Sequence, residues 1–428
     1  MQALASWLYS GLTVLAQPLL RRKLARRARS EPGYGQAIEE RFGTYTQQPE
    51  SRSELLWIHA VSLGETRAAA ILIAALREQL PGLRLLLTHG TATGREQGQA
   101  LLRPGDVQVW QPWDTPAATA RFFAHFRPRL GVLMETEVWP NWVAQAQAHA
   151  VPVVLANARL SDLSLQRALR LSALARPAYR ALSAVLAQTE GDAQRLRTLG
   201  APVQAVLGNL KFDATPDARL CALGQQRRAV LPRPVLMMAS SREGEEAALL
   251  KALAALPPPW PFELLIVARH PQRFAQVAEL IEGQGYPLSR RSDWGADLAA
   301  WPPPAGTVWL GDSLGEMALY YSLAGAALLG GSFERLGGQN LIEAAACGCP
   351  VIMGPHTFNF SEVAEQALQE EAGAAVADFP QALQLALQWF ARDDRPAGAK
   401  ALAFAQRHRG AALATASHVK AVWQSDRS

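Results

Sequence analysis

A glycine-rich stretch provides the first indication of chemistry in this sequence. Residues 324–329 are apolar and predict a buried strand, and four glycines follow before a short helix predicted over 340–347. Free backbone N–H groups in such a loop, together with the positive end of the helix, would bind a phosphate group. Glu343, one turn into the helix, could accept hydrogen bonds from two ribose hydroxyl groups. The stretch therefore indicates a nucleotide site.

The same stretch argues against two common classes of nucleotide-binding protein. It lacks the GxGxxG fingerprint of dinucleotide-dependent dehydrogenases and the GxxxxGK[ST] loop of nucleoside triphosphatases. An ordinary strand-loop-helix turn is the alternative for a glycine-rich loop considered alone.

The motif HAVSLGE, residues 59–65, places a carboxylate directly after a second predicted strand. A hydroxyl group is a weak nucleophile, and a carboxylate in this position can remove its proton as a new bond forms. Glu65 is therefore our candidate general base. The alternative is a glutamate that only stabilises the start of a helix. His59 is expected to be a buried, hydrogen-bonded histidine.

Two further motifs follow predicted strands in the first half of the chain. THGTATGRE, residues 88–96, leads into a helix predicted over 95–102 and would bind an anionic group of an acceptor. METEVWPN contains Glu135 and Glu137. Because side chains alternate along a strand, we expect only one carboxylate to face the site and choose Glu135; a structural ion pair is equally reasonable for Glu137. The predicted acceptor-binding residues are Ser62, Gly64, Thr91, Thr93, Gly94 and Arg95.

Cationic side chains complete the candidate site. Lys211 lies in GNLKFD, between the two halves of the chain, from where it could reach a leaving phosphate. Arg242 and the pair Arg269 and His270 follow predicted strands of the second half, as does Glu316 in GDSLGEM. Cations gathered at one sheet edge would be costly unless an anion neutralised them. This arrangement indicates a phosphate-bearing substrate.

Alternating strands and helices would position these residues. Strands are predicted over 55–59, 84–88, 130–134, 151–155 and 185–188 in the first half, and over 235–239, 264–268, 308–310, 324–329, 351–353 and 374–376 in the second. The alternation predicts an α/β protein with two Rossmann-like domains that face a central cleft. The carboxyl ends of the strands would line that cleft and bind the ligands.

The predicted domain organisation has five segments. They are an N-terminal membrane anchor with its basic flank over 1–30, an acceptor domain over 31–207, a linker over 208–225, a donor domain over 226–400, and a C-terminal segment over 401–428. The last helix, predicted over 398–423, could cross back to the first domain.

The N-terminus is first apolar and then basic. Residues 3–20 carry no charge, which is near the minimum length for spanning a bilayer, and RRKLARRAR follows. Because the charge comes after the apolar stretch, a cleavable signal peptide is disfavoured, and an uncleaved membrane-associating helix with its flank on the cytoplasmic side is favoured. Spanning the bilayer and lying in its interface remain open, and packing against the protein's own first domain is the alternative.

Charge and cysteine usage narrow the function classes further. The net charge of +5 would permit a nucleic-acid partner, but the basic residues concentrate at 21–29 and are not interleaved with aromatics, so none is predicted. Cys221, Cys347 and Cys349 are too few and too badly spaced for a disulfide scaffold or a zinc site. We therefore expect no zinc site and a reduced, cytoplasmic environment.

Together these motifs resemble those of the 3-deoxy-D-manno-octulosonic acid (Kdo) transferases, which act on the lipid A precursor of Gram-negative bacteria. The resemblance covers nearly the whole chain and rests on HAVSLGE, METEVWPN, GNLKFD, ARHPQR, GDSLGEM and GGSFERLGGQNLIEAAACGCPV, in this order. It implies the two-domain GT-B fold and an inverting glycosyltransferase without metal or cofactor. The implied donor is CMP-β-Kdo and the implied acceptor is the 6′-hydroxyl group of lipid IVA, in lipopolysaccharide synthesis at the cytoplasmic face of the inner membrane, among anionic lipids.

Residue roles are implied by the same motifs. Glu65 would be the general base, and Glu135 and Lys211 would assist the transition state. Leu314 to Glu316 would hold the nucleotide, and Asn340 to Glu343 would bind phosphate and ribose. The predicted donor-binding residues are Arg242, Arg269, His270, Leu314, Gly315, Glu316, Gly338, Gln339, Asn340, Leu341, Ile342 and Glu343.

Two alternatives remain, one a related enzyme and the other a protein of a different functional class. The first is a GT-B enzyme with another nucleotide sugar, or a related epimerase, and competition by CMP against UDP would separate it from a Kdo transferase. The second is a membrane-bound protein that binds lipid or nucleotide without turnover. For that protein, replacing Glu65 would leave function intact.

Overall fold

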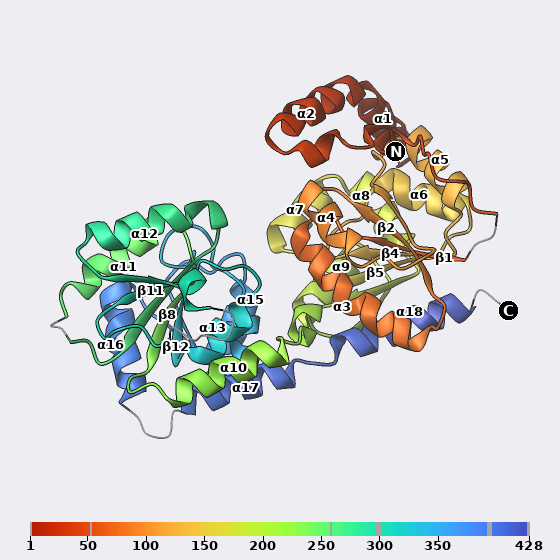
Figure 1. Cartoon of the computed structure of the whole chain (residues 1–428). Helices are drawn as coiled ribbons and strands as arrows, with labels where there is room; N and C mark the ends of the chain where they lie inside the picture. The colour runs from red at the N-terminus through yellow and green to blue at the C-terminus, as the bar shows by residue number, and fades with distance from the viewer. Residues whose placement is uncertain (1, 52–53, 257–258, 296–300, 392–395, 426–428) are drawn as a thin grey trace. The chain divides into compact units, whose positions relative to one another are not determined.

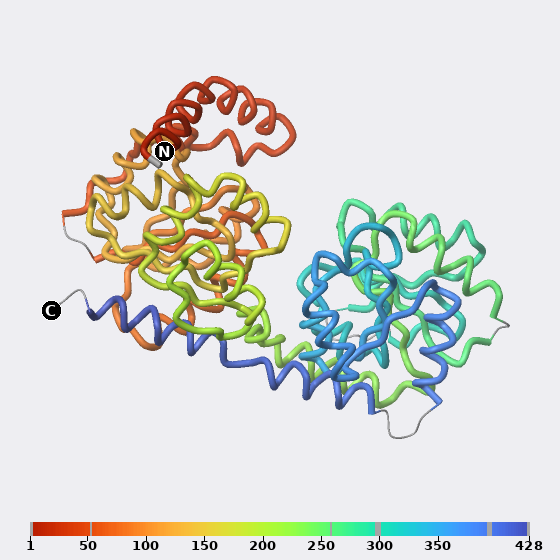
Figure 2. The backbone as a smooth tube through the Cα atoms, turned by 180° about the vertical axis from the view of Figure 1, so that it is seen from behind, coloured from red at the N-terminus to blue at the C-terminus, as the bar shows by residue number. Residues whose placement is uncertain are grey.

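The computed structural model describes residues 2–51, 54–256, 259–295, 301–391 and 396–425. The chain forms two compact units. Unit 1 comprises residues 1–213 and 409–428, and unit 2 comprises residues 214–408. Both ends of the chain therefore belong to unit 1 (Figure 2).

Unit 1 is built on one parallel sheet of seven strands in the order β3-β2-β1-β4-β5-β6-β7. The connection from β3 to β4 crosses from one edge of the sheet to its centre, so β1 and β4 are neighbours at the point where the strand order reverses. Ligands of such sheets bind outside the carboxyl ends of the strands at this switch point. The strands are β1 (Leu55–His59), β2 (Arg84–His89), β3 (Val107–Trp110), β4 (Leu130–Met134), β5 (Val153–Ala158), β6 (Ala184–Ala187) and β7 (Val203–Val206).

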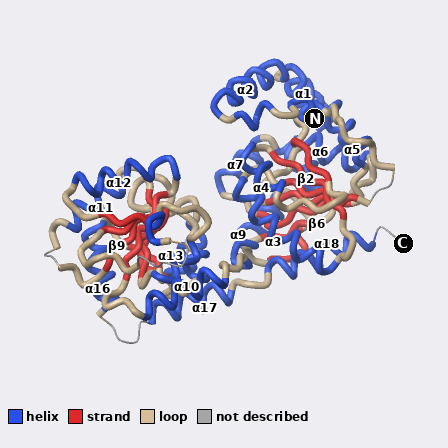
Figure 3. The backbone as a smooth tube through the Cα atoms, in the orientation of Figure 1, coloured by secondary structure: helices blue, strands red, loops and turns tan. Residues whose placement is uncertain are grey.

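Helices cover both faces of this sheet (Figures 1 and 3). Side chains alternate between the faces along each strand, so Trp57 of β1 belongs to one core and Ile58 to the other. A strand buried on both faces must be apolar throughout, which explains why β1 and β4 were recognisable from sequence. The helices are α3 (Leu63–Gln79), α4 (Ala92–Gln99), α5 (Pro116–Phe126), α6 (Pro140–Ala148), α7 (Asp162–Arg170), α8 (Ser172–Arg180), α9 (Glu190–Thr198) and α18 (Ala411–Ser425).

Hydroxyl side chains determine where most of these helices begin. Ser62, Thr91, Thr115, Ser161 and Thr189 each accept a hydrogen bond from the backbone N–H three residues later, at the starts of α3, α4, α5, α7 and α9. The cap at Thr91 starts α4 at Ala92, so the predicted helix over 95–102 was placed three residues too late.

Unit 2 has a related but not identical topology. Its seven parallel strands lie in the order β10-β11-β9-β8-β12-β13-β14, with β11 inserted between β10 and β9, and its switch point lies between β8 and β12. Its strands are β8 (Val235–Ser241), β9 (Glu263–Ala268), β10 (Leu288–Arg290), β11 (Val308–Leu310), β12 (Ala326–Leu329), β13 (Val351–Met353) and β14 (Gly373–Ala375). Its helices are α10 (Ala218–Ala229), α11 (Glu245–Leu253), α12 (Phe274–Gly283), α13 (Met317–Leu323), α14 (Ile342–Ala346), α15 (Ser361–Gln369), α16 (Phe379–Phe390) and α17 (Pro396–Arg407). The two units thus give the predicted pair of Rossmann-like domains.

Short 3-10 helices complete the chain: η1 (Pro32–Gly35), η2 (Ile38–Phe42), η3 (Leu210–Asp213), η4 (Pro271–Arg273) and η5 (Arg291–Trp294). The single helix predicted over 398–423 is wrong, because α17 and α18 are separated by residues 408–410. Gly410 has a φ of 106°, which few other residues adopt, and Asp213 accepts hydrogen bonds from the N–H groups of Gly410 and Ala412. α18 packs against α3 of unit 1 through bonds from Gln79 to Leu413 and Ser417.

The N-terminal segment folds into two helices, α1 (Gln2–Leu15) and α2 (Gln17–Ser30). α1 is attached to unit 1 by its polar side, since the Tyr9 hydroxyl group donates to Asp114 (2.7 Å) and the Ser10 hydroxyl group donates to Asn141 (2.9 Å). In the described part of the chain no single helix has the length and apolar composition needed to cross a membrane; α1 and α2 satisfy those criteria only as a pair bent by 46°.

Candidate active site

Glu65 lies in the first turn of α3, directly beyond the carboxyl end of β1. Its carboxylate accepts hydrogen bonds from the Val61 N–H (2.8 Å) and from the Ser62 hydroxyl group (2.9 Å), while the Ser62 Oγ accepts from the Glu65 N–H. This reciprocal arrangement is close to a capping box. Glu65 therefore does stabilise the start of α3, as the alternative interpretation of this residue proposed.

The surroundings of Glu65 also change its acid strength. The pKa of Glu65 is raised from 4.5 to about 7. Burial is the largest cause, the carboxylates Glu137 and Glu135 add to it, and the hydrogen bonds from Val61 and Ser62 oppose it. A carboxylate with a pKa near 7 is half ionised at neutral pH and accepts a proton readily. Glu65 thus has the property that a general base requires.

Glu135 follows the last residue of β4, at the other side of the switch point. It is 3% exposed and has a φ of 56°, a left-handed conformation that costs a non-glycine residue roughly 1–3 kcal/mol. Its two carboxylate oxygens bind different cations: Oε1 lies 3.3 Å from Lys211 Nζ, and Oε2 lies 2.8 Å from Arg159 Nε. The structure therefore brings together the three predicted residues Glu65, Glu135 and Lys211 and adds Arg159.

The expectation that strand alternation separates Glu135 from Glu137 is wrong. β4 ends at Met134, and the left-handed turn at Glu135 interrupts the alternation, so both carboxylates lie close enough to Glu65 to raise its pKa. Glu137 accepts from the indole N–H of Trp139 (2.8 Å), and burial raises its own pKa. Among the described residues it forms no ion pair.

The position of Lys211 is set by one asparagine distant in sequence and by a second one nearby. The side-chain oxygen of Asn157, at the end of β5, accepts from the Leu210 N–H (3.1 Å), and that of Asn209 accepts from the Lys211 N–H (3.0 Å). These bonds hold the turn η3 against the sheet, so the lysine reaches Glu135 from a fixed backbone.

The predicted acceptor loop connects to the loop that carries Glu65. Thr91 Oγ1 donates to the Val61 carbonyl (3.0 Å) and accepts from the Gly94 N–H, so it joins the two loops. Arg95 instead pairs with the buried Glu40 (2.9 Å) and lies over the Trp110 ring. Ser62 and Gly64 both precede Glu65 at the start of α3, and Thr93 is exposed.

The histidines of these loops are structural. His59 and His89 are buried, and burial lowers the pKa of His59 to about 3 and that of His89 to about 4, so both are neutral at physiological pH. His59 bonds to Thr88, as expected for a buried histidine.

In unit 2 a fully buried glutamate organises the switch point. Glu245, at the start of α11, accepts from the backbone N–H groups of Arg242 (2.8 Å), Gly331 (2.8 Å) and Phe333 (3.1 Å). It therefore ties the loop after β8 to the glycine loop after β12. The close approach of these loops also requires glycine at 330, where an added Cβ atom would lie 2.1 Å from the Ser240 oxygen.

We predict that Glu245→Gln lowers the free energy of unfolding by about 2 kcal/mol and weakens nucleotide binding. Glutamine has one acceptor oxygen in place of two, so its NH₂ group would face a backbone N–H and leave a buried donor unpaired. Urea unfolding and nucleotide titration measure the two effects. Glu243→Gln, at an exposed neighbour, should change stability by less than about 0.5 kcal/mol; equal effects of the two variants would contradict the role of Glu245.

The occupation of these N–H groups corrects one prediction. Gly331 donates to Glu245, Gly330 to Ala239 and Gly338 to Gly331, so these groups of the glycine loop are not free for a phosphate. Asn340 Oδ1 accepts from the Ile342 N–H (3.0 Å), and α14 is only five residues long. Phosphate binding in unit 2 would therefore depend more on cationic side chains than on a helix dipole.

Those side chains gather as predicted at the carboxyl ends of β8 and β9. Burial lowers the pKa of His270, and the positive charges of Arg242, Arg269 and Arg273 lower it further, which places all four groups in one electrostatic cluster. Arg273 is held by both oxygens of Glu246 (2.7 and 3.0 Å). Glu343 and Arg269 lie near the buried Tyr321 and both affect its pKa, so the ends of β9 and α14 are close together.

The predicted nucleotide segment after β11 is supported by a second network. Leu314 is exposed and Gly315 has a φ of 81°, whereas Glu316 accepts from the buried Arg291 (2.7 Å) and from Ser313. Arg291 comes from η5, which no sequence motif indicated. Gly338 to Ile342 are buried or partly buried.

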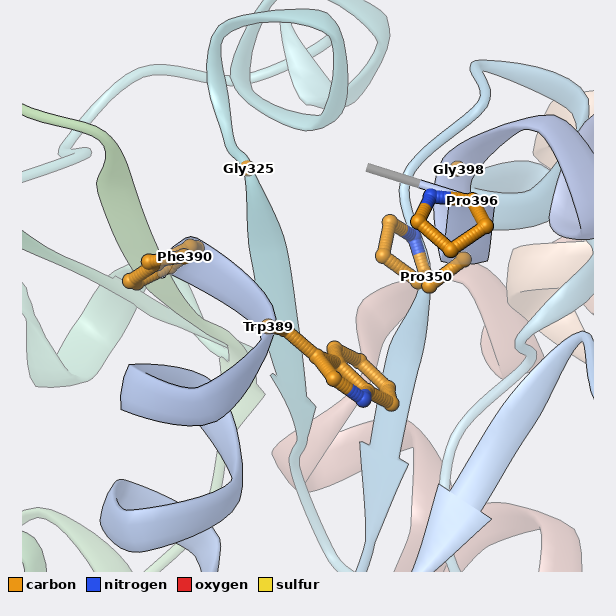
Figure 4. A pocket seen from close by; sticks show the side chains of 7 residues that line it. Gly325, Pro350, Trp389, Phe390, Pro396 and Gly398 are labelled. Carbon is orange, nitrogen blue, oxygen red and sulfur yellow. The ribbon is translucent and has the colours of Figure 1, made fainter. Parts of the chain in front are cut away.

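The apolar cavities of unit 2 lie elsewhere. One of about 20 Å³, shown in Figure 4, is lined by Gly325 and Pro350, which precede β12 and β13, together with Trp389, Phe390, Pro396, Ala397 and Gly398. A second, of about 350 Å³, is lined by Leu253, Ala254, Leu256, Pro259, Trp260, Tyr286 and Gly306. Both lie toward the amino ends of the strands, and none of the predicted site residues lines either one.

Comparison with known proteins shows which family the sequence resembles. The family profile described as "3-Deoxy-D-manno-octulosonic-acid transferase (kdotransferase)" matches residues 36–214. The chain is 45% identical to the 3-deoxy-D-manno-octulosonic acid transferase of Bordetella pertussis over 94% of each protein, and 33% identical to that of Haemophilus influenzae over 89% of each.

Solved structures agree on the fold. The calicheamicin glycosyltransferase CalG4 matches with a TM-score of 0.53 and 15% identity, over 87% of this chain and 98% of its own. At that identity the likeness concerns the fold alone, and it agrees with the two Rossmann-like units of the GT-B type. With an identity of 45% over nearly the whole length of a relative, the chain belongs to the 3-deoxy-D-manno-octulosonic acid transferases, a family of glycosyltransferases.

Proposed function

We propose that this transferase moves Kdo from CMP-β-Kdo to the 6′-hydroxyl group of lipid IVA, with inversion of the anomeric carbon and without a metal ion. The observation that carries the proposal is the group of Glu65, Glu135 and Lys211 at the switch point of unit 1, where a base with a pKa of about 7 lies beside a fixed carboxylate-lysine pair. The names of the relatives support Kdo as the transferred sugar.

The chemical step is a single displacement. Glu65 removes the proton of the acceptor hydroxyl group while the hydroxyl oxygen forms a bond to the anomeric carbon. The bond from that carbon to CMP breaks, and its electron pair stays on the phosphate. The reacting carbon passes through a state with oxocarbenium character. Attack from the side opposite to CMP inverts the configuration.

Cationic groups stabilise the charge that grows on the phosphate. Within unit 1 the cation is Lys211. Within unit 2 the cations are Arg242 and Arg269, which lie near His270, whose lowered pKa favours its neutral form. Fixed cations stabilise a developing anion because they need not reorganise during the reaction. This role is the one that a divalent metal fills in many other sugar transferases, which supports a mechanism without a metal ion.

Competition by free nucleotides tests the donor assignment. In a transfer assay containing EDTA, CMP should inhibit at concentrations at which UDP does not. Inhibition by UDP alone would favour an enzyme that uses another nucleotide sugar, and dependence on added divalent metal would contradict the metal-free mechanism.

The pH dependence of transfer follows from the state of Glu65. Only the ionised carboxylate accepts a proton, and the raised pKa means that this form is lost as the pH falls through about 7. We therefore predict that kcat/KM is level above pH 8 and decreases tenfold per pH unit below about 7. A profile that stays level down to pH 5 would contradict the assignment of Glu65 as the base.

We also propose that the enzyme works at the cytoplasmic face of the inner membrane, with α1 lying in the membrane interface. The polar residues Tyr9 and Ser10 hold α1 to unit 1, and its outward side is apolar. The basic residues of α2 suit anionic lipids. The exposed apolar residues of α1 are Leu4, Trp7, Leu8, Leu12, Val14 and Leu15.

Charge on this apolar side should prevent membrane binding. Leu8 and Leu12 are 61% and 66% exposed, and transfer of each side chain from water into an apolar environment is worth roughly 1.5–3 kcal/mol. We predict that the double variant Leu8→Glu, Leu12→Glu lowers the affinity for anionic vesicles, measured by cosedimentation, by about a hundredfold or more. Val230→Glu, which alters a similarly exposed residue of unit 2, serves as the control; equal loss in both would contradict the role of α1.

A further inference from the structure

We infer that Arg159 is a positioning residue for this reaction: together with Lys211 it fixes Glu135 and limits the negative charge that Glu135 presents to Glu65. This inference rests on the proposed function, in which Glu65 is the base. No motif in the sequence pointed to Arg159, which follows β5, the strand next to β4.

Arg159 holds Glu135 at two points. Its backbone N–H donates to the Glu135 carbonyl (3.3 Å), and its side-chain Nε donates to Glu135 Oε2 (2.8 Å). Lys211 binds the other oxygen at 3.3 Å. One residue thus fixes both the backbone and the carboxylate of Glu135, and the two cations fix the direction of the carboxylate plane.

The end of β5 is shaped for this task. The pairing of β5 with β6 shifts register between Leu155 and Ala158, and Asn157 has a left-handed φ of 52°. Asn157 accepts a hydrogen bond from the turn that carries Lys211, and Arg159, two residues later, binds Glu135. Left-handed backbone at a non-glycine residue such as Glu135 is uncommon and clusters at functional sites, whereas asparagine adopts it more readily. The same short segment therefore fixes both partners of the carboxylate-lysine pair.

The exposure of the Arg159 side chain indicates that its contact with Glu135 fixes the position of the carboxylate more than it stabilises the fold. The Arg159 side chain is 54% exposed and that of Glu135 is 4% exposed, so the guanidinium group keeps much of its hydration and the pair is screened by water. Within the described part of the chain, Arg159 has no other acidic partner.

The electrostatic consequence falls on Glu65. The charged groups near the two carboxylates are Glu137 from the turn after β4, Lys211 from η3 and Arg159 itself. Tyr179 of α8, whose pKa is raised by burial and by Glu137, is neutral, and the Asp192–Arg195 pair of α9 binds the backbone of Leu160. Glu135 raises the pKa of Glu65. Arg159 and Lys211 are both in contact with Glu135, and positive charges at these positions should act on Glu65 in the opposite direction. Without Arg159, only Lys211 compensates Glu135, and Glu65 should hold its proton to a higher pH.

The test is the pH profile of kcat/KM for Arg159→Gln and Arg159→Lys, with the melting temperature measured in parallel. The acid limb of Arg159→Gln should move upward by about half to one pH unit, so that activity falls several-fold at pH 6.5 and recovers at pH 8.5. The limb of Arg159→Lys should lie between those of the wild type and Arg159→Gln. Arg197→Gln removes an arginine of similar exposure that pairs with Glu190, and its limb should coincide with that of the wild type.

The outcomes separate this inference from the function on which it rests. A wild-type limb near pH 7 that neither Arg159 variant moves would overturn the inference alone, as would a loss of activity that is equal at every pH and matches a lower melting temperature. A wild-type profile without a limb would overturn the proposed base and the inference together. If Arg159→Gln does not fold, the shift measured for Arg159→Lys decides the question.

Discussion

Replacing Glu65 with glutamine should lower turnover by about a hundredfold or more and leave donor affinity unchanged. Glutamine cannot accept the acceptor proton at neutral pH, so the nucleophile would have to lose that proton to water. The substitution preserves the local structure, because a glutamine at this helix position can still accept from the Val61 N–H as the glutamate does. The loss should therefore appear in kcat while the protein stays folded.

Controls separate the chemical role of Glu65 from its capping role. Glu78→Gln removes an exposed carboxylate from the same helix and should leave turnover unchanged. Donor binding is measured by titration with CMP, and folding by the melting temperature. Retained turnover in Glu65→Gln would contradict its role as the base and would favour a protein that only binds its ligands.

Replacing Lys211 with alanine should lower turnover by about two orders of magnitude. The variant removes a fixed cation and leaves the buried Glu135 with Arg159 alone, so both the stabilisation of the leaving phosphate and the placement of Glu135 are lost. Because the Lys211 side chain is 26% exposed, we expect a smaller effect on stability than for a fully buried ion pair.

A matched control and a conservative variant define the effect of Lys211. Lys251→Ala removes an exposed lysine from α11 of unit 2 and should leave turnover unchanged. Lys211→Arg keeps the charge but changes its geometry, so it should recover part of the activity. Equal turnover for Lys211→Ala and the wild type would remove Lys211 from the reaction.

The sequence predicted those parts of the fold that burial determines. Strands covered on both faces are apolar throughout, so β4, β11 and β13 were predicted with their observed bounds. The missed strands β3, β7 and β10 all lie at sheet edges, where partial exposure allows mixed sequences such as VQVW, VQAV and LSR. Each of the three has only three or four residues and includes a polar one, so its apolar pattern is too short to distinguish a strand from a loop.

For the candidate site, the sequence predicted which residues gather at the sheet edge but not which residues they bind. Parallel strands end at one edge, so residues that follow strands were expected to gather there, and the grouping of Glu65, Glu135 and Lys211 agrees with that expectation. The same rule applied to β5 would have indicated Arg159, had the strand been predicted to its observed end at Ala158. The role of Glu245 depends on backbone groups 86 and 88 residues away and had no local signal.

Mass spectrometry of lipid IVA incubated with the purified enzyme tests the central claim most directly. The reaction contains CMP-Kdo and EDTA, and parallel reactions contain Glu65→Gln or omit the donor. We predict that lipid IVA gains the mass of one or more Kdo units with the wild-type enzyme and gains none in the parallel reactions over the same time. Unchanged lipid IVA, with CMP still bound by the enzyme, would contradict the proposed acceptor, and an equal gain with Glu65→Gln would contradict the proposed base.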